Sequence, residues 1–319
     1  MIKAASKLYL RTLTLYILGC QCSASLLGMT SLVILQDSAD NSLLRISFGS
    51  ATVERIASGV PGVAFLKDKS GDFFVLSRHS LIRVALDGTK TALVQDYPDS
   101  DWSAFVQLED GSFVVADRFK NQLHRIGKNG DVSVFAVIPD ATKASMFCEL
   151  MLSGGNLLLF RLGDDEALRL FEISQTGEVK NIKLTGAVRS PGKPHYVNSS
   201  NRYEDVAFGL GPILPDNDGG FYFNDVESTR TLYHSTKSGF VRKLTSFGRA
   251  LDYAGMLLDS NNKRILMFQA PCLYSIDLET FEKSEKPVYC NLLLTHPIQM
   301  IVSDGLRDKV LVSPSNRKH

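Results

Sequence analysis

Residues 104–135 read AFVQLEDGSFVVADRFKNQLHRIGKNGDVSVF, and this stretch decides the fold. It contains four short apolar segments, at 104–108, 113–116, 123–126 and 132–135. The residues between them are rich in Gly, Asn and Asp, which tolerate the positive φ angles of tight hairpin turns. The pattern therefore predicts a meander of four antiparallel strands.

The end of the third segment, an apolar strand followed by a small turn residue, recurs six times along the chain. The turn residues are Ser50, Gly88, Gly130, Gly177, Gly239 and Thr280. They are separated by 38, 42, 47, 62 and 41 residues, which is the length of one four-stranded propeller blade. We therefore expect an all-β, six-bladed β-propeller over residues 31–319.

The last copy of the pattern continues from the C-terminus into the N-terminus. Ile298–Val302 and Val310–Val312 read as a first and a second strand, whereas Leu43–Ile46 and Val53–Ile56 read as a third and a fourth. Pairing of these N- and C-terminal strands would close the ring and bury two sheet edges. Leu32–Leu35 also reads as a second strand, so the closing blade has one candidate strand too many.

The stretch from Ala104 to Leu123 resembles the NHL repeat, in which an apolar strand, Asp-Gly, a second apolar strand with Ala-Asp, and an Asn follow one another. Residues 219–225 and 71–76 are weaker copies. The chain thus resembles the NHL-repeat and gluconolactonase-regucalcin-like superfamily of six-bladed propellers. This resemblance implies the scaffold, and it implies a metal-dependent lactonase as one candidate activity.

Residues 1–24 are typical of a signal peptide: a basic start, an uncharged leucine-rich run at 12–18, and then small residues. Two processing sites remain open, one at residues 22–24 and one at a lipobox-like sequence in which Cys20 would carry lipid. The uncharged run is too short for an anchor that spans the membrane. We expect a secreted or extracytoplasmic protein, lipid-anchored at Cys20 if bacterial, that is not integral to the membrane after cleavage.

Charge gives no sign of a nucleic-acid partner. The chain has 35 Lys and Arg against 34 Asp and Glu, and these residues are scattered along it. Phosphate-backbone binding needs a concentrated basic surface, so nucleic acid is excluded as an expected partner. A small molecule or a protein remains.

Three cysteines follow the leader. Cys272 and Cys290 fall on the third and fourth strands of one predicted blade, at neighbouring positions. A disulfide bridge and a pair of buried thiols are both compatible with that placement. Cys148 is left unpaired in either case.

In propellers of this type, one functional face is built from two sets of loops. One set leads into the innermost strands, and the other joins second to third strands. The loops on this face carry acids, aromatic residues and histidines, and a long insertion at residues 189–205 extends them as a roof. The candidate ligand-binding residues are Asp101, Trp102, Glu149, His195, Tyr203, Glu204, Asp252 and His296.

Three of these acids, Glu149, Glu204 and Asp252, are candidate metal ligands. The resemblance implies a metal held by a Glu at the first inner strand, by Asn residues from later blades and by an Asp. In this chain residues 60–62 read Val-Pro-Gly at the first position, so this carboxylate is missing. A divalent cation, calcium or zinc, is the cofactor that such oxygen-rich or His-containing sites would take.

Two functions follow from these observations. The first is a secreted NHL-like propeller that binds a ligand or a protein partner on its loop-rich face. The alternative is a metal-dependent lactonase or hydrolase of the gluconolactonase-like class. The sequence leaves open whether the protein is an enzyme.

Overall fold

The computed structural model describes residues 31–36, 41–47, 52–139, 148–162, 168–186, 196–197, 202–203, 210–216, 218–225, 231–246, 256–259, 263–269, 272–282, 284, 289–290 and 298–303. Every regular element in these residues is a β-strand. Among them no helix is long and apolar enough to cross a membrane. The predicted leader, residues 1–24, lies outside the described residues.

The described strands form five four-stranded sheets, one five-stranded sheet and one two-stranded sheet. The terminal sheet contains, from one edge to the other, β27 (Ile298–Ser303), β1 (Ser31–Gln36), β2 (Ser42–Ser47) and β3 (Thr52–Ala57). The next two are β4 (Ala64–Lys67), β5 (Phe73–Leu76), β6 (Leu81–Val84) and β7 (Lys90–Val94), and then β8 (Trp102–Gln107), β9 (Phe113–Asp117), β10 (Gln122–Ile126) and β11 (Val132–Val137).

The fourth sheet contains β12 (Cys148–Ser153), β13 (Asn156–Leu162), β14 (Leu168–Ile173) and β15 (Val179–Ile182). The five-stranded sheet contains β19 (Leu210–Pro215), β20 (Phe221–Asp225), β21 (Thr231–Ser235) and β22 (Phe240–Ser246), with β16 (Thr185–Gly186) added in parallel to β22. The remaining sheets are β23 (Met256–Asp259), β24 (Arg264–Gln269), β25 (Cys272–Asp277) and β26 (Tyr289–Cys290), and the hairpin of β17 (Tyr196–Val197) and β18 (Arg202–Tyr203).

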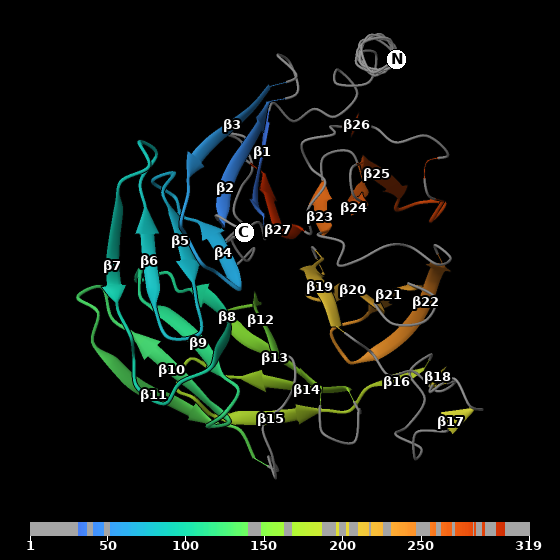
Figure 1. Cartoon of the computed structure of the whole chain (residues 1–319). Coiled ribbons are helices and arrows are strands. Elements are labelled where there is room, and N and C mark those ends of the chain that lie inside the picture. The colour runs from blue at the N-terminus through green and yellow to red at the C-terminus, as the bar shows by residue number, and fades with distance from the viewer. Residues whose placement is uncertain are drawn as a thin grey trace, which may run out of the picture.

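The sheets are arranged as in a propeller (Figure 1). One edge strand of each of the six larger sheets lies toward the centre of the molecule, namely β4, β8, β12, β19, β23 and β27. Each of these strands contacts the next one around the centre. Strands β3, β7 and β11 lie at the outside, where most of their side chains are exposed or half-buried.

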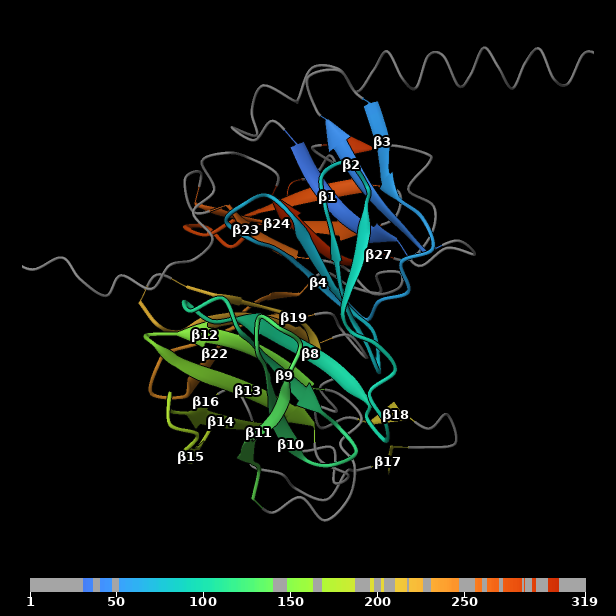
Figure 2. The ribbon, with the colours of Figure 1, turned by 90° about the vertical axis from the view of Figure 1, so that its left-hand side faces the viewer.

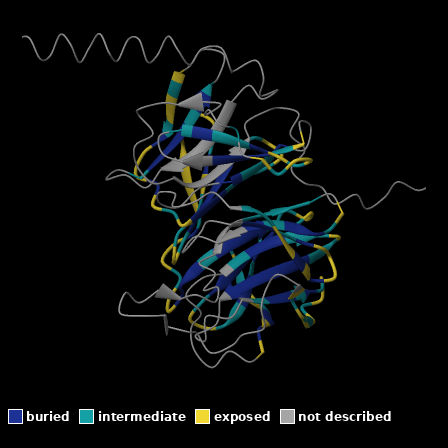
Figure 3. Cartoon of the chain, turned by 90° about the vertical axis from the view of Figure 1, so that its right-hand side faces the viewer, coloured by how far each residue is buried: buried dark blue, intermediate teal, exposed yellow. Residues whose placement is uncertain are grey.

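A sheet that lies between two others is buried on both faces, because it packs against the sheet before and the sheet after. On β9, Phe113 and Val115 enter the hydrophobic cluster shared with the β4–β7 sheet, whereas Val114 and Ala116 enter the cluster shared with the β12–β15 sheet. Alternate residues of a strand point to opposite faces, so burial on both faces requires a continuous apolar run. Figure 3 shows this burial along the strands and the exposure at the turns.

The terminal sheet corrects one expectation. β1 pairs with β27 on one side and with β2 on the other, and Leu35 lies opposite both Met300 and Leu43. Leu32–Leu35 is therefore the second strand of this sheet, in the position expected for Val310–Val312, and β27 from the C-terminal part of the chain is the innermost strand. Val310–Val312 lies outside the described residues. Figure 2 shows β1, β2 and β3 side by side.

The placement of the two cysteines is confirmed. Cys272 on β25 lies directly opposite Cys290 on β26 in the antiparallel register. Opposed antiparallel residues have Cα atoms about 4.5–5.5 Å apart, which is within the reach of a disulfide. Cys272 is disulfide-bonded in the structure.

The recurring turn glycine joins one sheet to the previous one. Gly130 has a φ of +87°, and a Cβ atom built there would lie 2.3 Å from the carbonyl oxygen of Leu93 on β7. Gly177 repeats the arrangement against the carbonyl oxygen of Phe135 on β11, at 2.4 Å. At Gly130 and Gly177 the turn between third and fourth strands thus abuts the outer strand of the preceding sheet, and only glycine fits at these two positions.

We predict that Gly130→Ala lowers the free energy of unfolding by about 2–4 kcal/mol, because the new methyl group meets a backbone carbonyl and the positive φ is unfavourable for alanine. Gly154→Ala is the matched control. Its φ is also positive, at +59°, but its Cβ would meet only the Nζ of Lys237, at 3.8 Å. Urea unfolding should show that Gly154→Ala lowers the free energy of unfolding by less, about 1 kcal/mol. Equal losses in the two variants would contradict the inter-sheet contact.

We also predict that deletion of residues 298–319 abolishes cooperative unfolding. The deletion removes β27 and leaves the hydrogen-bonding edge of β1 unpaired at the centre of the molecule. Deletion of residues 304–319 keeps all four strands of the terminal sheet and should keep a cooperative transition. Scanning calorimetry of the two truncated chains distinguishes the outcomes, and a cooperative melt of the shorter chain at the wild-type midpoint would refute this role of β27.

Candidate functional site

Three connections meet where β8 begins: residues 77–80 between β5 and β6, residues 95–101 between β7 and β8, and residues 118–121 between β9 and β10. Backbone hydrogen bonds tie them together. The N–H of Trp102 donates to the carbonyl of Arg78 at 2.9 Å, and the N–H of Arg118 donates to the carbonyl of Asp101 at 3.0 Å. The three connections therefore form one platform that spans two neighbouring sheets.

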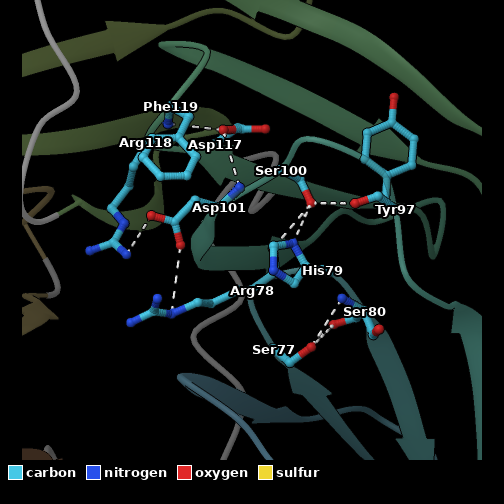
Figure 4. A network of polar contacts seen from close by, with 10 residues as sticks. All are labelled: Ser77, Arg78, His79, Ser80, Tyr97, Ser100, Asp101, Asp117, Arg118 and Phe119. Carbon is cyan, nitrogen blue, oxygen red and sulfur yellow. Dashed lines mark hydrogen bonds and ion pairs between the residues drawn. The ribbon is translucent and has the colours of Figure 1, made fainter.

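Asp101 is the centre of this platform, and it is 5% exposed. Its Oδ2 lies 2.6 Å from Nη2 of Arg118, and its Oδ1 lies 3.8 Å from Nε of Arg78 (Figure 4). The two arginines come from different connections and approach the same carboxylate. We call Arg78, Asp101 and Arg118 the Asp101 cluster.

A second set of hydrogen bonds fixes the connection that carries Asp101. The buried hydroxyl of Ser100 lies 2.8 Å from the carbonyl oxygen of Tyr97 and 3.1 Å from that of Arg78. It also lies 3.1 Å from Nδ1 of His79. Asp101 is therefore held by its neighbour in the chain as well as by the arginines.

Asp117, at the end of β9, holds the third connection in place. Its Oδ1 accepts the N–H groups of Phe119 at 3.0 Å and Lys120 at 3.1 Å, and that of Asp101 at 3.4 Å. The turn ends at Asn121, whose φ of +51° suits an asparagine. The turn presents Phe119, which is 64% exposed, beside Arg118.

Trp102, a predicted ligand-binding residue, is a core residue in this structure. It is fully buried in the cluster between the β4–β7 and β8–β11 sheets, and its ring stacks on Tyr97 at 5.3 Å between centroids. Nζ of Lys120 lies over the ring of Tyr97, 5.4 Å from its centroid. Trp102 thus packs in the core next to the platform, and it has no exposed surface that a ligand could contact.

Glu149, the second residue of β12, is a desolvated carboxyl group. It lies opposite Phe160 of β13 and keeps part of its surface exposed. Burial alone raises its pKa from 4.5 to about 7. Strongly perturbed carboxyl groups are enriched at functional sites, although structural burial produces them too.

The structure brings together only part of the predicted site. Asp101 and Trp102 are consecutive at the start of β8, and Glu149 lies on the next innermost strand, which contacts β8. His195, Glu204, Asp252 and His296 lie outside the described residues. The backbone of Tyr203 belongs to the β17–β18 hairpin, which Figure 1 shows beside β16 at the periphery.

The metal site also stays a prediction. In the described part of the chain no group of three or more His, Cys, Asp or Glu side chains is placed to hold an ion. Of the three predicted ligands only Glu149 is described. Asp101 shares its carboxylate with arginines, which compete with a cation for the same oxygens.

Sequence reasoning missed Arg78, Arg118 and Asp117. All three lie in or beside connections between second and third strands, which the sequence analysis expects on the functional face. The Ala-Asp of the NHL-like stretch marks Asp117, and Arg118 follows it directly. Searching those connections for charged residues, in addition to the loops that lead into innermost strands, would have found the cluster.

We predict that Glu149→Gln removes part of the pH dependence of stability. Because the folded-state pKa is raised, the wild type is most stable below the unfolded-state pKa near 4.5 and loses about 3 kcal/mol between pH 4.5 and 7. In urea unfolding, the variant should have the same free energy of unfolding as the wild type at pH 4 and a higher one at pH 8. Glu109→Gln, at an exposed turn position, should change neither value. A variant no more stable at pH 8 would show that Glu149 is well solvated.

No protein family model matches the chain, and no curated protein matches its sequence. Solved structures do match it. A streptogramin B lyase is 12% identical with a TM-score of 0.56, over 84% of this chain and 87% of the lyase. A calcium-binding protein, regucalcin, from Agrobacterium tumefaciens is 14% identical with a TM-score of 0.50, over 70% of this chain and 74% of regucalcin.

A putative 6-phosphogluconolactonase from Bacteroides fragilis is also similar to the chain, with 13% identity and a TM-score of 0.52 over 85% of this chain and 97% of that protein. At such identities the similarity shows the fold and not the activity. The chain therefore has the β-propeller fold that the NHL-like stretch indicates and that regucalcin-like and lactonase-like proteins share.

Proposed function

We propose that this chain is an exported, six-bladed NHL-like propeller that binds a ligand on its loop-rich face, at the Asp101 cluster. One observation carries the proposal: Arg78 and Arg118, from connections of two neighbouring sheets, converge on the buried carboxylate of Asp101. Convergent polar groups held by a rigid scaffold are what distinguish a binding site from ordinary surface. The ligand is a small molecule or part of a protein.

Two features support six closed blades. The innermost strands β4, β8, β12, β19, β23 and β27 contact one another in succession, and β27 also contacts β4. The β27–β1 ladder joins strands from the two ends of the chain in one sheet. On this proposal the terminal sheet is the sixth blade, closed by one C-terminal and three N-terminal strands.

Export is supported by the cysteine chemistry as well as by the leader-like residues 1–24. Cys272 is disulfide-bonded, and disulfides persist in oxidising compartments and are rare in the cytosol of mesophiles. We propose that residues 1–24 direct the chain out of the cytoplasm, with Cys20 as a lipid-anchoring residue if the host is bacterial.

A metal-dependent lactonase or hydrolase is the second candidate, and Glu149 favours it. A carboxyl group with a pKa of about 7 is suited to general acid–base catalysis near neutral pH. Alternatively, Glu149 would bind calcium or zinc together with Glu204 and Asp252, and the cation would then hold its carboxylate ionised. The structurally similar proteins include a lyase, a putative lactonase and a calcium-binding protein, so the fold accommodates either function.

The binding proposal predicts that ligand binding requires the side chain of Arg118. The full-length protein is screened by thermal shift against neutral sugars, sugar acids, amino sugars and short peptides. A ligand at a hundredfold excess over its Kd adds about 2.7 kcal/mol of stability and raises the Tm by several degrees. This shift should disappear in Arg118→Ala.

Arg125→Ala is the matched control, because Arg125 pairs with Asp110 at the opposite end of the same sheet. It should keep the ligand-induced shift. A shift that survives Arg118→Ala would place the site elsewhere. Stoichiometric calcium or zinc in the purified protein, together with lactone hydrolysis that is lost in Glu149→Gln, would favour the hydrolase.

A further inference from the structure

We propose that the ligand of the Asp101 cluster is a neutral, hydroxyl-rich molecule, a glycan, in which one hydroxyl group bridges Asp101 and Arg78. This inference rests on the proposed function and specifies the chemistry of its ligand. It follows from three features of the cluster: an unused acceptor, a gap of a particular length, and an exposed aromatic ring.

The unused acceptor is Oδ1 of Asp101. Oδ2 is engaged by Arg118, but within the described residues the buried Oδ1 has no hydrogen-bond partner. A carboxylate oxygen only accepts hydrogen bonds, so whatever completes this site must donate one. Leaving a buried charged acceptor unsatisfied costs about 1–3 kcal/mol or more, and a donating ligand would recover that free energy.

The gap is the 3.8 Å between Oδ1 of Asp101 and Nε of Arg78. It is too long for a direct hydrogen bond and short enough for a single oxygen atom to bond to both groups. That oxygen must donate to the carboxylate and accept from the guanidinium. A hydroxyl group does both at one atom, whereas a peptide group separates its donor and its acceptor on different atoms.

Arg78 controls access to the gap. Its side chain is 66% exposed, whereas that of Asp101 is 7% exposed, so the arginine is the member of the pair that can move. At 3.8 Å the pair makes no direct hydrogen bond that would hold the exposed arginine in one position. Arg78 can therefore swing aside on a fast timescale and return to donate to the hydroxyl oxygens of a bound ligand.

Charges of both signs lie in the connections that form the cluster. Arg78, Arg118 and Lys120 are cationic, whereas Asp96, Asp99 and Asp117 are anionic in addition to Asp101. Neither sign dominates, so the charge around the cluster does not select an ionic ligand, and a neutral ligand is compatible with it.

Phe119 supplies the apolar part of the site. Phe119 is 64% exposed, and its backbone N–H is fixed by Asp117. Figure 4 shows it in the same region as Arg118 and Asp101. A pyranose ring has an apolar C–H face and a rim of hydroxyls, so it can pack on an aromatic ring while its rim faces the cluster.

The test uses the full-length protein on an array of immobilised neutral, acidic and amino-containing glycans. We expect the bound glycans to be neutral. In solution, binding is read from the fluorescence of Trp102, the one tryptophan of the chain, which directly follows Asp101. Asp101→Asn should weaken binding about tenfold or more, and Phe119→Ala about threefold to tenfold.

Asp110→Asn is the matched control, since Asp110 pairs with Arg125 at the other end of the sheet, and it should bind normally. Phe119→Ala changes an exposed side chain, so it tests the site even if Asp101→Asn fails to fold. Binding of no glycan, binding of charged glycans alone, or full binding by Phe119→Ala would each overturn this inference. If another ligand binds and its binding is lost in Arg118→Ala, the proposed function stands and only the identification of the ligand as a glycan is wrong. If no ligand loses its binding in Arg118→Ala, both the proposed function and this inference are wrong.

Discussion

The constraint on which the rest of the structure depends is that the sheets are apolar on both faces. On a strand such as β9, Phe113 lies in one inter-sheet cluster and Val114 in the next. A single sheet therefore cannot bury its apolar side chains without a neighbour on each face. Each sheet must be covered on both sides, and an end sheet would leave one face in water. The β27–β1 ladder joins strands from distant parts of the chain in one sheet, as a closed arrangement of sheets would require.

The same constraint creates the candidate site. Because neighbouring sheets pack face to face, the connection before β8 lies against the connections that precede β6 and β10. Charged residues distant in sequence, Arg78 and Arg118, are thereby held within reach of Asp101. Trp102, packed beneath them in the core, couples the position of this cluster to the packing of the scaffold.

Much of the scaffold could be predicted from the sequence, since its signals are local. The strands around 104–135 follow from short apolar runs separated by turn residues, and the opposition of Cys272 and Cys290 follows from counting along one meander. The terminal sheet could be predicted only in part, because Leu32–Leu35 and Val310–Val312 have similar local patterns, and only the pairing of β1 with β2 and β27 shows Leu32–Leu35 to be its second strand. Of the Asp101 cluster, the sequence singles out Asp101 alone as a candidate, because the two arginines come from connections whose proximity appears only after folding.

Asp–Arg pairs occur at both ends of the β8–β11 sheet, and the contrast between them bears on function. At the hairpin end, Arg125 pairs directly with Asp110, both side chains are largely exposed, and Asp110 also accepts hydrogen bonds from Ser112. At the other end, the carboxylate of Asp101 is buried and its Oδ1 has no hydrogen-bond partner within the described residues. Burying an incompletely satisfied charge lowers stability, whereas an exposed pair is nearly neutral. A local cost of this kind is typical of sites shaped for binding, which is why Asp101, and not Asp110, is the residue to which we assign function.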